Sequence, residues 1–348
     1  MKRVAILCGG PGSEHEISCL SAGGVLSAIN RLEYEPILIG ITLDGEWMSL
    51  PLDYPLSLQD GVLPSVTGDF PHVSRGKDGM SIDGVVLTVD VIFPVLHGTY
   101  GEDGQLQSDL DQLDIPYVGS GAAASERAMD KSDAKSFFAA AGIAIAPGIT
   151  VTEFEWKRDP SAVTQLIEPL GLPIFVKASR GGSSLGTVKV KELTSFAAAI
   201  EEALKFDSKV LIESAIDGAE VECAVLEVAG SAQASIPGKV WIDPQYEFYD
   251  YQAKYLDGAT RIDIPAPFSA EIIEKVQNYA LIAFKAIGAK GLARVDFFVT
   301  KAGEIIINEI NTMPGFTRTS AYPKMWQASG IGYSEVITHL LQSASTFN

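Results

Sequence analysis

Short apolar runs separated by polar, glycine-containing segments dominate the first third of the chain. Residues 4–7 and 36–41 are predicted as buried strands, because each is a short apolar run next to turn residues. Between them, Ser13 and Glu16 have the spacing of a capping box, which predicts a helix that continues to about Ile29. The chain is therefore expected to begin as strand, helix, strand.

The same alternation continues further along the chain. Residues 85–96 and 114–118 are predicted as strands, and the polar stretch 53–83 is expected to pass over the surface. Strands that alternate with helices form parallel sheets, which bind ligands in the loops at the strand ends. The pattern thus predicts an α/β fold with a doubly wound parallel sheet in the N-terminal part.

The rest of the chain mixes helices and strands. Predicted strands lie at residues 173–177, 188–190 and 210–214. Predicted helices lie at residues 122–140, 193–204 and 270–287, and the chain is expected to be mostly β between 215 and 269. Three domains fit this order best, with boundaries at 1–122, 123–216 and 217–348.

Two β-rich runs near the C-terminus, 292–300 and 305–311, predict a hairpin with a loop at 301–304. If Thr300 pairs with Ile305, Asp296 lies opposite Glu309 and Arg294 lies opposite Asn311. These four polar side chains then share one face of the hairpin. The other face is expected to carry Phe297, Val299, Ile306 and Ile310.

Two carboxylates directly opposite each other repel, which destabilises a sheet unless something lies between them. Asp296 and Glu309 become compatible if a hard divalent ion joins their oxygens, and Mg²⁺ is bound in this way together with substrate phosphates. The alternative is a solvated sheet face with mixed charges. Four polar residues on one face of Ile- and Phe-rich strands favour the cation site.

Composition restricts the partners. The 348 residues carry a net charge of −18, spread along the whole chain, which opposes binding to nucleic acid or to an anionic membrane. We expect a cytoplasmic protein, because the N-terminal apolar run is too short for a signal peptide and no apolar run is long enough to span a membrane. Three cysteines without Cys-x-x-Cys spacing are expected to be buried small residues.

A glycine- and serine-rich loop, 179–186, lies between two predicted strands and includes Ser183 and Ser184. Its backbone amides can approach an anion closely, so it is predicted to cradle phosphate, with a simple flexible turn as the alternative. No Lys-Ser/Thr pair follows it, so it is not a Walker A loop. Lys177, which ends the preceding apolar strand, is predicted to reach a nucleotide.

Further candidates lie at strand ends and in loops. Glu213 and Glu220 are candidates for adenine or ribose contacts, with plain surface exposure as the alternative. The aromatic segment 248–255 is predicted to be a lid in which Lys254 reaches transferred phosphate, or else a loop packed on its own tyrosines.

Three further single residues are candidates, and the first two leave two interpretations open. Glu14 is predicted either to cap the first helix or to bind a substrate ammonium group. His97 is as compatible with loop packing as with a ligand contact. The Gly315 amide, beside the predicted metal site, is a candidate donor to an oxyanion.

Together these motifs resemble the D-alanine:D-alanine ligase family, ATP-grasp enzymes of peptidoglycan synthesis. No single motif suffices, but their order and spacing make chance resemblance improbable. The matching segments are Gly9-Gly-Pro-Gly-Ser-Glu-His-Glu-Ile-Ser18, His97-Gly-Thr-Tyr-Gly-Glu-Asp-Gly104, Met129-Asp-Lys131, Val176-Lys-Ala-Ser-Arg-Gly-Gly-Ser-Ser-Leu-Gly186, Phe248-Tyr-Asp-Tyr-Gln-Ala-Lys-Tyr255, Ala293-Arg-Val-Asp296 and Asn308-Glu-Ile-Asn-Thr-Met-Pro-Gly315.

The resemblance implies roles for individual residues. Lys131 and Lys177 match lysines that contact ATP, Glu213 and Glu220 match the adenine and ribose acids, and Asp296, Glu309 and Asn311 match the ligands of two Mg²⁺, with Mn²⁺ as an alternative ion. Glu14 matches the residue that binds the ammonium of the first D-alanine, and Arg294 the one that binds its carboxylate and later the oxyanion. Ser320 matches the residue that binds the second carboxylate, while Glu14, Ser183 and Tyr255 match a hydrogen-bonded set that closes the lid.

The resemblance also implies an ATP-grasp fold whose two α+β domains enclose ATP, a homodimer, and ligation of two D-alanines through an acyl phosphate. Two rival functions are a ligase that joins D-alanine to D-lactate and a nucleotide sensor without activity. Tyr255 in the lid favours the dipeptide over the lactate product. The intact set Arg294, Asp296, Glu309, Asn311 and Ser320 argues against a sensor.

Overall fold

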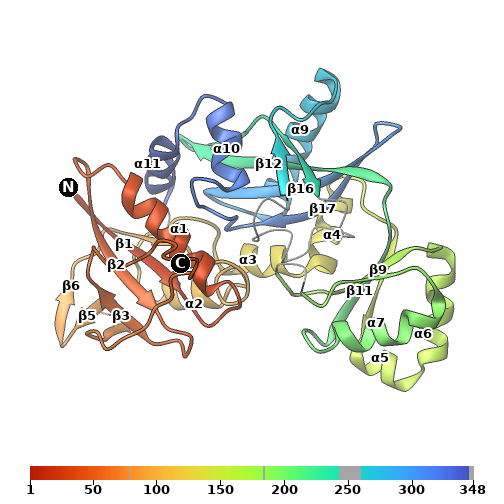
Figure 1. Ribbon diagram of the computed structural model, residues 1–348, viewed down its shortest axis with the longest axis horizontal. Coiled ribbons are helices and arrows are strands. Elements are labelled where there is room, and N and C mark those ends of the chain that lie inside the picture. The colour runs from red at the N-terminus through yellow and green to blue at the C-terminus, as the bar shows by residue number, and fades with distance from the viewer. Residues whose placement is uncertain (78, 183–184, 243–259, 345–348) are drawn as a thin grey trace.

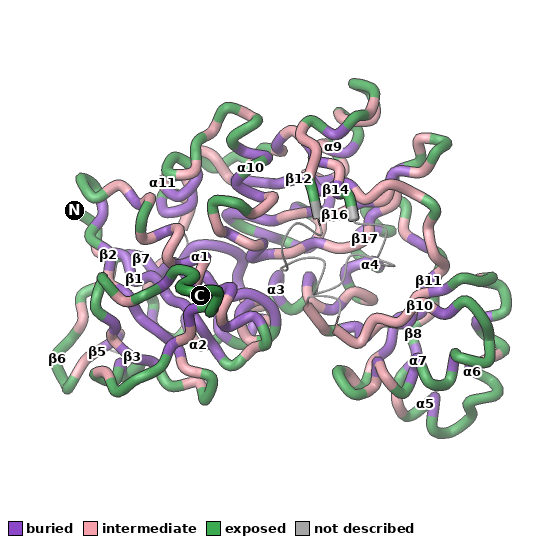
Figure 2. The backbone as a smooth tube through the Cα atoms, viewed as in Figure 1, coloured by how far each residue is buried: buried purple, intermediate pink, exposed green. Residues whose placement is uncertain are grey.

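In the described part of the chain, three main sheets follow one another (Figure 1). The computed structural model describes residues 1–77, 79–182, 185–242 and 260–344. The N-terminal sheet lies at one end of the molecule, the central sheet at the other, and the C-terminal sheet between and above them (Figure 1). Purple buried backbone runs through the inner strands of the three main sheets, whereas exposed backbone lies in turns and in outer helices and strands (Figure 2).

The N-terminal sheet has the order β3-β2-β1-β7. Strands β1 (Lys2–Gly9), β2 (Tyr34–Ile41) and β7 (Val91–Pro94) are parallel, whereas the edge strand β3 (Trp47–Leu50) is antiparallel to β2. Helix α1 (His15–Ala28) connects β1 to β2. The predicted parallel α/β core is therefore confirmed, with one antiparallel edge.

The predicted strand 85–96 is wrong as a single element. β6 (Val85–Leu87) joins β4 (Val73–Gly76) and β5 (Gly79–Ile82) in a separate antiparallel sheet. The chain then passes Asp90, whose carboxylate accepts the N–H of Arg3 at 2.6 Å before β7 begins. This polar contact at the start of β7 separates the two apolar runs that the sequence pattern had merged.

Residues 114–118 were also predicted as a strand, but only one bridge forms there, between Ile92 and Tyr117. Pro116 has no N–H to donate, so the ladder does not extend. Helix α2 (Gln105–Asp111) precedes this segment.

The predicted capping box at the start of α1 does not form. The N-cap is Glu14, and its side chain makes no capping hydrogen bond, while Ser13 is exposed. Glu14 is instead only 6% exposed, with its carboxylate next to Gly98 and Gly182. The helix start is shaped by burial of this acid.

The predicted helix 122–140 is two helices, α3 (Ala122–Met129) and α4 (Lys131–Ala140). They are separated at Asp130, whose backbone is extended and whose carboxylate accepts the N–H of Asp133 as an N-cap. The same carboxylate accepts from Ser179 Oγ at 2.7 Å and from Lys209 Nζ at 2.9 Å. Asp130 therefore ties the start of α4 to the central sheet.

The central sheet is antiparallel with the order β10-β9-β11-β8. The three predicted strands are confirmed as β9 (Ile174–Ala178), β10 (Val188–Val190) and β11 (Lys209–Ser214), and β8 (Gly148–Thr152) was not predicted. The predicted helix 193–204 is a 3-10 turn, Leu193–Ser195, followed by α7 (Phe196–Ala203). Two unpredicted helices, α5 (Glu153–Arg158) and α6 (Pro160–Ile167), lie next to α7 (Figure 1) and pack on β8.

The C-terminal sheet has the order β15-β14-β12-β16-β17, with β13 paired to β12. Its strands are β12 (Gly218–Val228), β13 (Ser231–Ala234), β14 (Gly238–Ile242), β15 (Thr260–Asp263), β16 (Leu292–Thr300) and β17 (Ile305–Asn311). Helix α9 (Ala270–Ile287), as predicted, covers one face and shares its apolar core. The opposite face carries the polar side chains of the hairpin.

Two helices after β17, α10 (Ala321–Ala328) and α11 (Tyr333–Ser343), were not predicted. They share one apolar core with α1 and β1, so the C-terminal end of the chain packs on the N-terminal sheet. The three cysteines are buried, as predicted. The three domain boundaries remain predictions.

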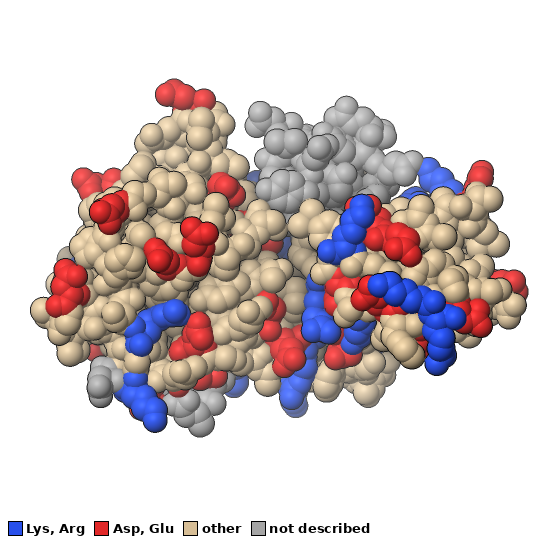
Figure 3. All heavy atoms as spheres, turned by 90° about the horizontal axis from the view of Figure 1, so that it is seen from below, with Lys and Arg blue, Asp and Glu red and all other residues tan. Residues whose placement is uncertain are grey.

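Surface charge and helix composition add two observations. Carboxylates are scattered over the whole face shown in Figure 3, whereas lysines and arginines gather mainly on its right half. None of the helices in the described part of the chain has the length and apolar character needed to cross a membrane.

Candidate functional site

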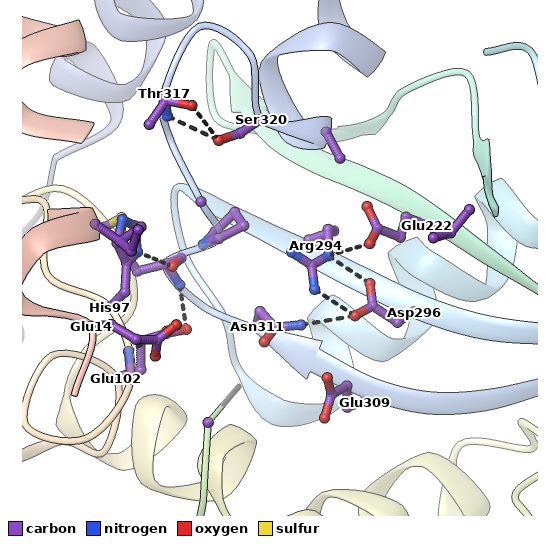
Figure 4. A pocket seen from close by; sticks show the side chains of 18 of the residues that line it. Glu14, His97, Glu102, Glu222, Arg294, Asp296, Glu309, Asn311, Thr317 and Ser320 are labelled. Atoms are coloured by element: carbon purple, nitrogen blue, oxygen red, sulfur yellow. Dashed lines mark hydrogen bonds and ion pairs between the residues drawn. The ribbon is translucent and has the colours of Figure 1, made fainter. Parts of the chain in front are cut away.

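A cavity of about 1840 Å³ lies between the central sheet, the C-terminal sheet, and helix α1 with nearby loops of the N-terminal part. Side chains from all three parts of the chain line it, including Glu14 at the start of α1, Lys177 from the central sheet and Arg294 from the C-terminal hairpin. Figure 4 shows Glu14, Glu102 and His97 on one side of the cavity and the hairpin residues on the other. Most of the predicted site residues therefore converge on one space.

The hairpin places its polar pairs as predicted, although its loop differs. Asp296 pairs with Glu309 and Arg294 pairs with Asn311. The loop is one residue shorter than expected, because Thr300 bonds Glu304 rather than Ile305. A β-bulge that contains Asn308 restores the register.

Because of the bulge, one residue that was predicted on the apolar face, Ile306, lies on the other face. Ile306 pairs with Phe298, on the face of Asp296, and not with Phe297 and Val299 as expected. Ile310, beyond the bulge, lies opposite Val295 on the buried face, as predicted. Alternation along the strand predicts a face only as far as the first bulge.

Arg294 forms a two-pronged ion pair with Asp296 on its own strand. Nε donates to Asp296 Oδ1 at 2.8 Å and Nη2 donates to Oδ2 at 2.7 Å. Glu222, directly opposite Asp296 on β12, brings its Oε1 to 3.5 Å from Arg294 Nε. The guanidinium is therefore fixed between two carboxylates at the wall of the cavity (Figure 4).

The predicted metal ligands lie together on this face. Asn311 Nδ2 donates to Asp296 Oδ2 at 3.1 Å, and Glu309 Oε2 lies 3.6 Å from Lys131 Nζ. Within the described residues, no three His, Cys, Asp or Glu side chains group as a metal site by themselves. Two opposed carboxylates and one amide oxygen nevertheless fit Mg²⁺, which takes its remaining oxygens from water and substrate phosphates.

Glu213 joins two lysines at the end of β11. Its Oε1 lies 2.7 Å from Lys135 Nζ and its Oε2 lies 3.0 Å from Lys177 Nζ. Burial alone would raise the pKa of Glu213, but the charges of Lys177 and Lys135 outweigh it and hold that pKa below its ordinary value. Burial lowers the pKa of Lys135. At Lys177 burial also acts to lower the pKa, but the charge and hydrogen bond of Glu213, together with the charges of Glu309 and Glu220, raise it above its ordinary value.

The glycine- and serine-rich loop contacts the start of α4. Lys131 Nζ donates to the Gly181 carbonyl at 2.5 Å. Ser183, Ser184, Lys254 and Tyr255, and with them the predicted lid 248–255, lie outside the described residues. Glu220 lines the cavity on the same face of β12 as Glu222.

Glu102 bridges two loops at the base of the cavity. Its Oε1 accepts the Gly98 N–H and its Oε2 accepts the Met313 N–H, both at 2.9 Å. Burial raises the pKa of Glu102 to about 8, with a further contribution from the nearby Glu14 charge. The Glu14 carboxylate lies so close to Gly98 that a Cβ there would come within 2.2 Å of its Oε2.

His97 uses both ring nitrogens within the protein. Nδ1 contacts the Met313 carbonyl and Nε2 contacts Ser21 Oγ, each at 2.8 Å. Burial lowers the pKa of His97, which fits a neutral ring that donates from Nδ1 and accepts at Nε2. These contacts support the loop-packing alternative over a direct substrate contact.

Ser320 and Gly315 lie in the segment between β17 and α10. Ser320 is the N-cap of α10, but its hydroxyl accepts from Thr317 N at 3.1 Å and contacts Thr317 Oγ1 at 2.8 Å. A Cβ on Gly315 would lie 3.3 Å from Ser320 Oγ. Two of the predicted substrate donors are therefore neighbours in space.

Among the residues that the structure describes, sequence reasoning missed four polar residues of the site. Lys135 follows Lys131 by one helical turn, which was a readable signal. Glu222 lies on the same face of β12 as Glu220. Its position opposite Asp296, however, depends on β12 and β16 being neighbours in the sheet. Asn308 accepts from Lys177 Nζ at 3.4 Å only because the bulge turns it toward the cavity. Glu102 bonds a residue 211 positions away, and no local pattern signals that contact.

Comparisons with known families match both halves of the chain. Residues 3–120 match the family described as "D-ala D-ala ligase N-terminus" and residues 137–342 match "D-ala D-ala ligase C-terminus". A "D-alanine--D-alanine ligase" of Paenarthrobacter aurescens is 45% identical over 99% of this chain and 95% of its own length. The protein of the same name from Streptomyces coelicolor is 43% identical over 98% of this chain and 92% of its own length.

Solved structures agree with these matches. The VanG D-Ala:D-Ser ligase of Enterococcus faecalis superposes with a TM-score of 0.86 at 35% identity, covering 98% of each chain. The D-alanine-D-alanine ligase of Coxiella burnetii superposes with a TM-score of 0.83 at 32% identity, covering 99% of this chain and 95% of its own.

Proposed function

The chain belongs to the D-alanine:D-alanine ligase family, and we propose that its cavity joins two D-alanines at the cost of ATP. It has the ATP-grasp fold of these ligases. The protein is an ATP-dependent ligase for peptidoglycan precursor synthesis. The observation that carries the proposal is the convergence on one cavity of Glu14, near the N-terminus, with Arg294 and Ser320, in the C-terminal part of the chain.

The reaction has two steps. The carboxylate of the first D-alanine attacks the γ-phosphorus of ATP, which releases ADP and leaves D-alanyl phosphate. The amine of the second D-alanine, having lost a proton, then attacks the acyl carbon, and phosphate leaves with the bonding electrons. A free carboxylate is a poor acyl donor, so the first step converts its oxygen into a good leaving group.

The central sheet supports nucleotide binding in this proposal. Lys131 on α4 and Lys177 on β9 are assigned to neutralise phosphates, and Lys177 Nζ lies 3.0 Å from Glu213 Oε2. Glu220 is assigned to ribose and Glu213 to adenine, while Ser183, Ser184 and Lys254 are assigned to phosphate. Such phosphoryl transfer depends mainly on positioning and charge neutralisation.

Asp296, Glu309 and Asn311 are proposed to hold two Mg²⁺, with Mn²⁺ as an alternative, and the ions supply charge neutralisation for the phosphates. Arg294 already bonds Asp296 through both prongs of its guanidinium. When Asp296 binds cation, Glu222 remains as a carboxylate 3.5 Å from Arg294 Nε. Arg294 is then directed at the substrate carboxylate.

The remaining assignments concern the two D-alanines. Glu14 is assigned to the ammonium of the first, and Ser320 to the carboxylate of the second. Arg294 and the Gly315 amide are assigned to the tetrahedral oxyanion of the second step. Tyr255, together with Glu14 and Ser183, is assigned to lid closure. His97 is assigned to holding the loop at Met313, consistent with the 2.8 Å contact between His97 Nδ1 and the Met313 carbonyl.

A second product is considered because a D-Ala:D-Ser ligase superposes well. Phosphate release from ATP is measured with D-alanine, with L-alanine, and with D-alanine plus D-serine or D-lactate. Release with D-alanine alone and no stimulation by the second compound supports the dipeptide. Stimulation by D-serine or D-lactate indicates a mixed product, and no D-alanine-dependent release refutes ligase activity.

We also propose a cytoplasmic homodimer. Light scattering coupled to size-exclusion chromatography tests this assembly, and a mass near 37.1 kDa at micromolar concentration would indicate a monomer instead.

A further inference from the structure

Phe316 lies between Gly315 and Thr317 and is fixed by residues far away in the sequence. Its ring is fully buried and packs edge-on against Phe93, with 5.8 Å between ring centroids. Its N–H donates to Ser21 Oγ at 3.4 Å, and its carbonyl accepts from Tyr333 Oη at 2.6 Å. Helices α1 and α11 thus hold both main-chain polar groups of this residue.

The two hydrogen bonds of Phe316 influence two groups that are proposed to bind substrate, the Gly315 amide and the Ser320 hydroxyl. Gly315 directly precedes Phe316, and its Cβ position lies 3.3 Å from Ser320 Oγ. Thr317, which follows Phe316, contacts the same hydroxyl at 2.8 Å. A shift of the Phe316 peptide therefore moves the Gly315 amide and the Ser320 hydroxyl together.

Helix α1 is shaped to admit the Tyr333 phenol. A Cβ on Gly24 would lie 2.7 Å from Tyr333 Oη and 3.6 Å from the Phe316 carbonyl. Glycine inside a helix costs about 1 kcal/mol relative to alanine, so the space it leaves has a structural use. The Tyr333 ring also packs beside the Phe316 ring, with 5.5 Å between centroids.

We propose that Tyr333 and Ser21 are positioning residues for the second substrate. Through their hydrogen bonds to Phe316 they set the places of the Gly315 amide and the Ser320 hydroxyl before substrate arrives. The proposal rests on the function proposed above for those two donors. Because the ATP-binding lysines lie on α4 and β9, the effect falls on the second D-alanine and not on ATP.

Tyr333→Phe is the sharpest variant, since it removes the hydroxyl and keeps the ring packing. Phosphate release is measured as a function of D-alanine concentration and fitted with one tight and one weak D-alanine site. The weak site stands for the second D-alanine. We expect the KM of the weak site to rise about threefold to tenfold, as for loss of one hydrogen bond, with the KM of ATP unchanged. Gly24→Ala should act in the same direction, because its methyl group displaces the phenol from Phe316.

Tyr117→Phe is the matched control. It loses a phenol hydrogen bond of 2.8 Å to Asp111, outside the cavity lining. Its melting temperature should fall about as much as that of Tyr333→Phe, with both D-alanine KM values unchanged. Ser21→Ala combined with Tyr333→Phe should be non-additive on the weak-site KM, because both act on one peptide.

Amide hydrogen exchange of the peptide covering residues 312–320 gives a readout that does not require ligase activity. Exchange should be several-fold faster in Tyr333→Phe and Gly24→Ala than in wild type and Tyr117→Phe. Unchanged exchange overturns the restraint itself. Faster exchange with an unchanged weak-site KM, or an equal rise in the KM of ATP, overturns the positioning role.

Discussion

Arg294 and Asp296, two residues apart on β16, are joined through both guanidinium prongs at 2.8 and 2.7 Å. This pair places a substrate-binding cation and a metal ligand in direct contact. Whatever binds Asp296 therefore changes the freedom of Arg294. The pair links the proposed metal site to the proposed site of bond formation.

Arg294→Ala should lower kcat by a factor on the order of a hundred or more, because it removes a charged donor to the oxyanion. Arg294→Lys should recover little, since an ammonium cannot reproduce the two-pronged geometry. Steady-state phosphate release measures both variants, and circular dichroism checks their fold. Arg75→Ala, which breaks the Arg75–Asp109 pair of 3.0 Å at the surface, should leave turnover unchanged. Near-wild-type turnover of Arg294→Ala would refute its assignment.

Glu222→Gln tests a residue that the sequence did not single out. Its charge lies 3.5 Å from Arg294 and directly opposite Asp296 on the neighbouring strand. We expect about a tenfold loss in kcat/KM for D-alanine, because Arg294 loses a carboxylate that orients it. Kinetics at saturating ATP measure the loss. An unchanged kcat/KM would show that Asp296 alone orients the guanidinium.

Cation dependence tests the hairpin ligands. Chelation with EDTA should abolish phosphate release, and added Mg²⁺ or Mn²⁺ should restore it. Asp296→Asn and Glu309→Gln should raise the Mg²⁺ concentration for half-maximal activity at least about tenfold. Glu304→Gln, an exposed acid on the same hairpin, is the control. Full activity in EDTA, or equal Mg²⁺ dependence in all variants, would count against the assignment.

Glu213→Gln should destabilise the free protein by about 3 to 5 kcal/mol, because it leaves Lys135 and Lys177 buried without their carboxylate. Nucleotide phosphates should partly replace the lost charge. We therefore expect ADP to raise the melting temperature of the variant more than that of wild type at equal site saturation. Glu202→Gln, in an exposed pair with Lys205, should melt like wild type. If Glu213→Gln melts like wild type, Glu213 is not needed as the counter-charge of Lys135 and Lys177.

Much of the hairpin site follows from sequence, and the reason is local. Alternation within β16 and β17 places Asp296, Glu309 and Asn311 on one face, and a short loop brings the strands together. The bulge at Asn308 was not readable, so the side of Ile306 was predicted wrongly. The break at Asp130 depends on Ser179 and Lys209, which no helical pattern includes. Contacts such as Glu102 to Met313 require the whole fold and stay beyond local reasoning.

The pKa of Glu102 predicts a pH dependence of stability. Its folded value, about 8, lies above the ordinary value of 4.5, so the folded protein binds more protons than the unfolded chain between these values. Its contribution to stability is therefore fully present below about pH 4.5 and is lost as the pH rises through 8. The melting temperature of wild type minus that of Glu102→Gln should shrink from pH 5 to pH 8. A constant difference would contradict the raised pKa.

The transfer of an oxygen atom tests ligation through an acyl phosphate most directly. Protein, ATP and Mg²⁺ are incubated with D-alanine labelled with ¹⁸O in its carboxylate, and the products are weighed by mass spectrometry. The account predicts D-alanyl-D-alanine and inorganic phosphate in equal amounts, with one ¹⁸O in each phosphate, because the attacking carboxylate oxygen leaves with it. Unlabelled phosphate, or phosphate without dipeptide, would contradict the account.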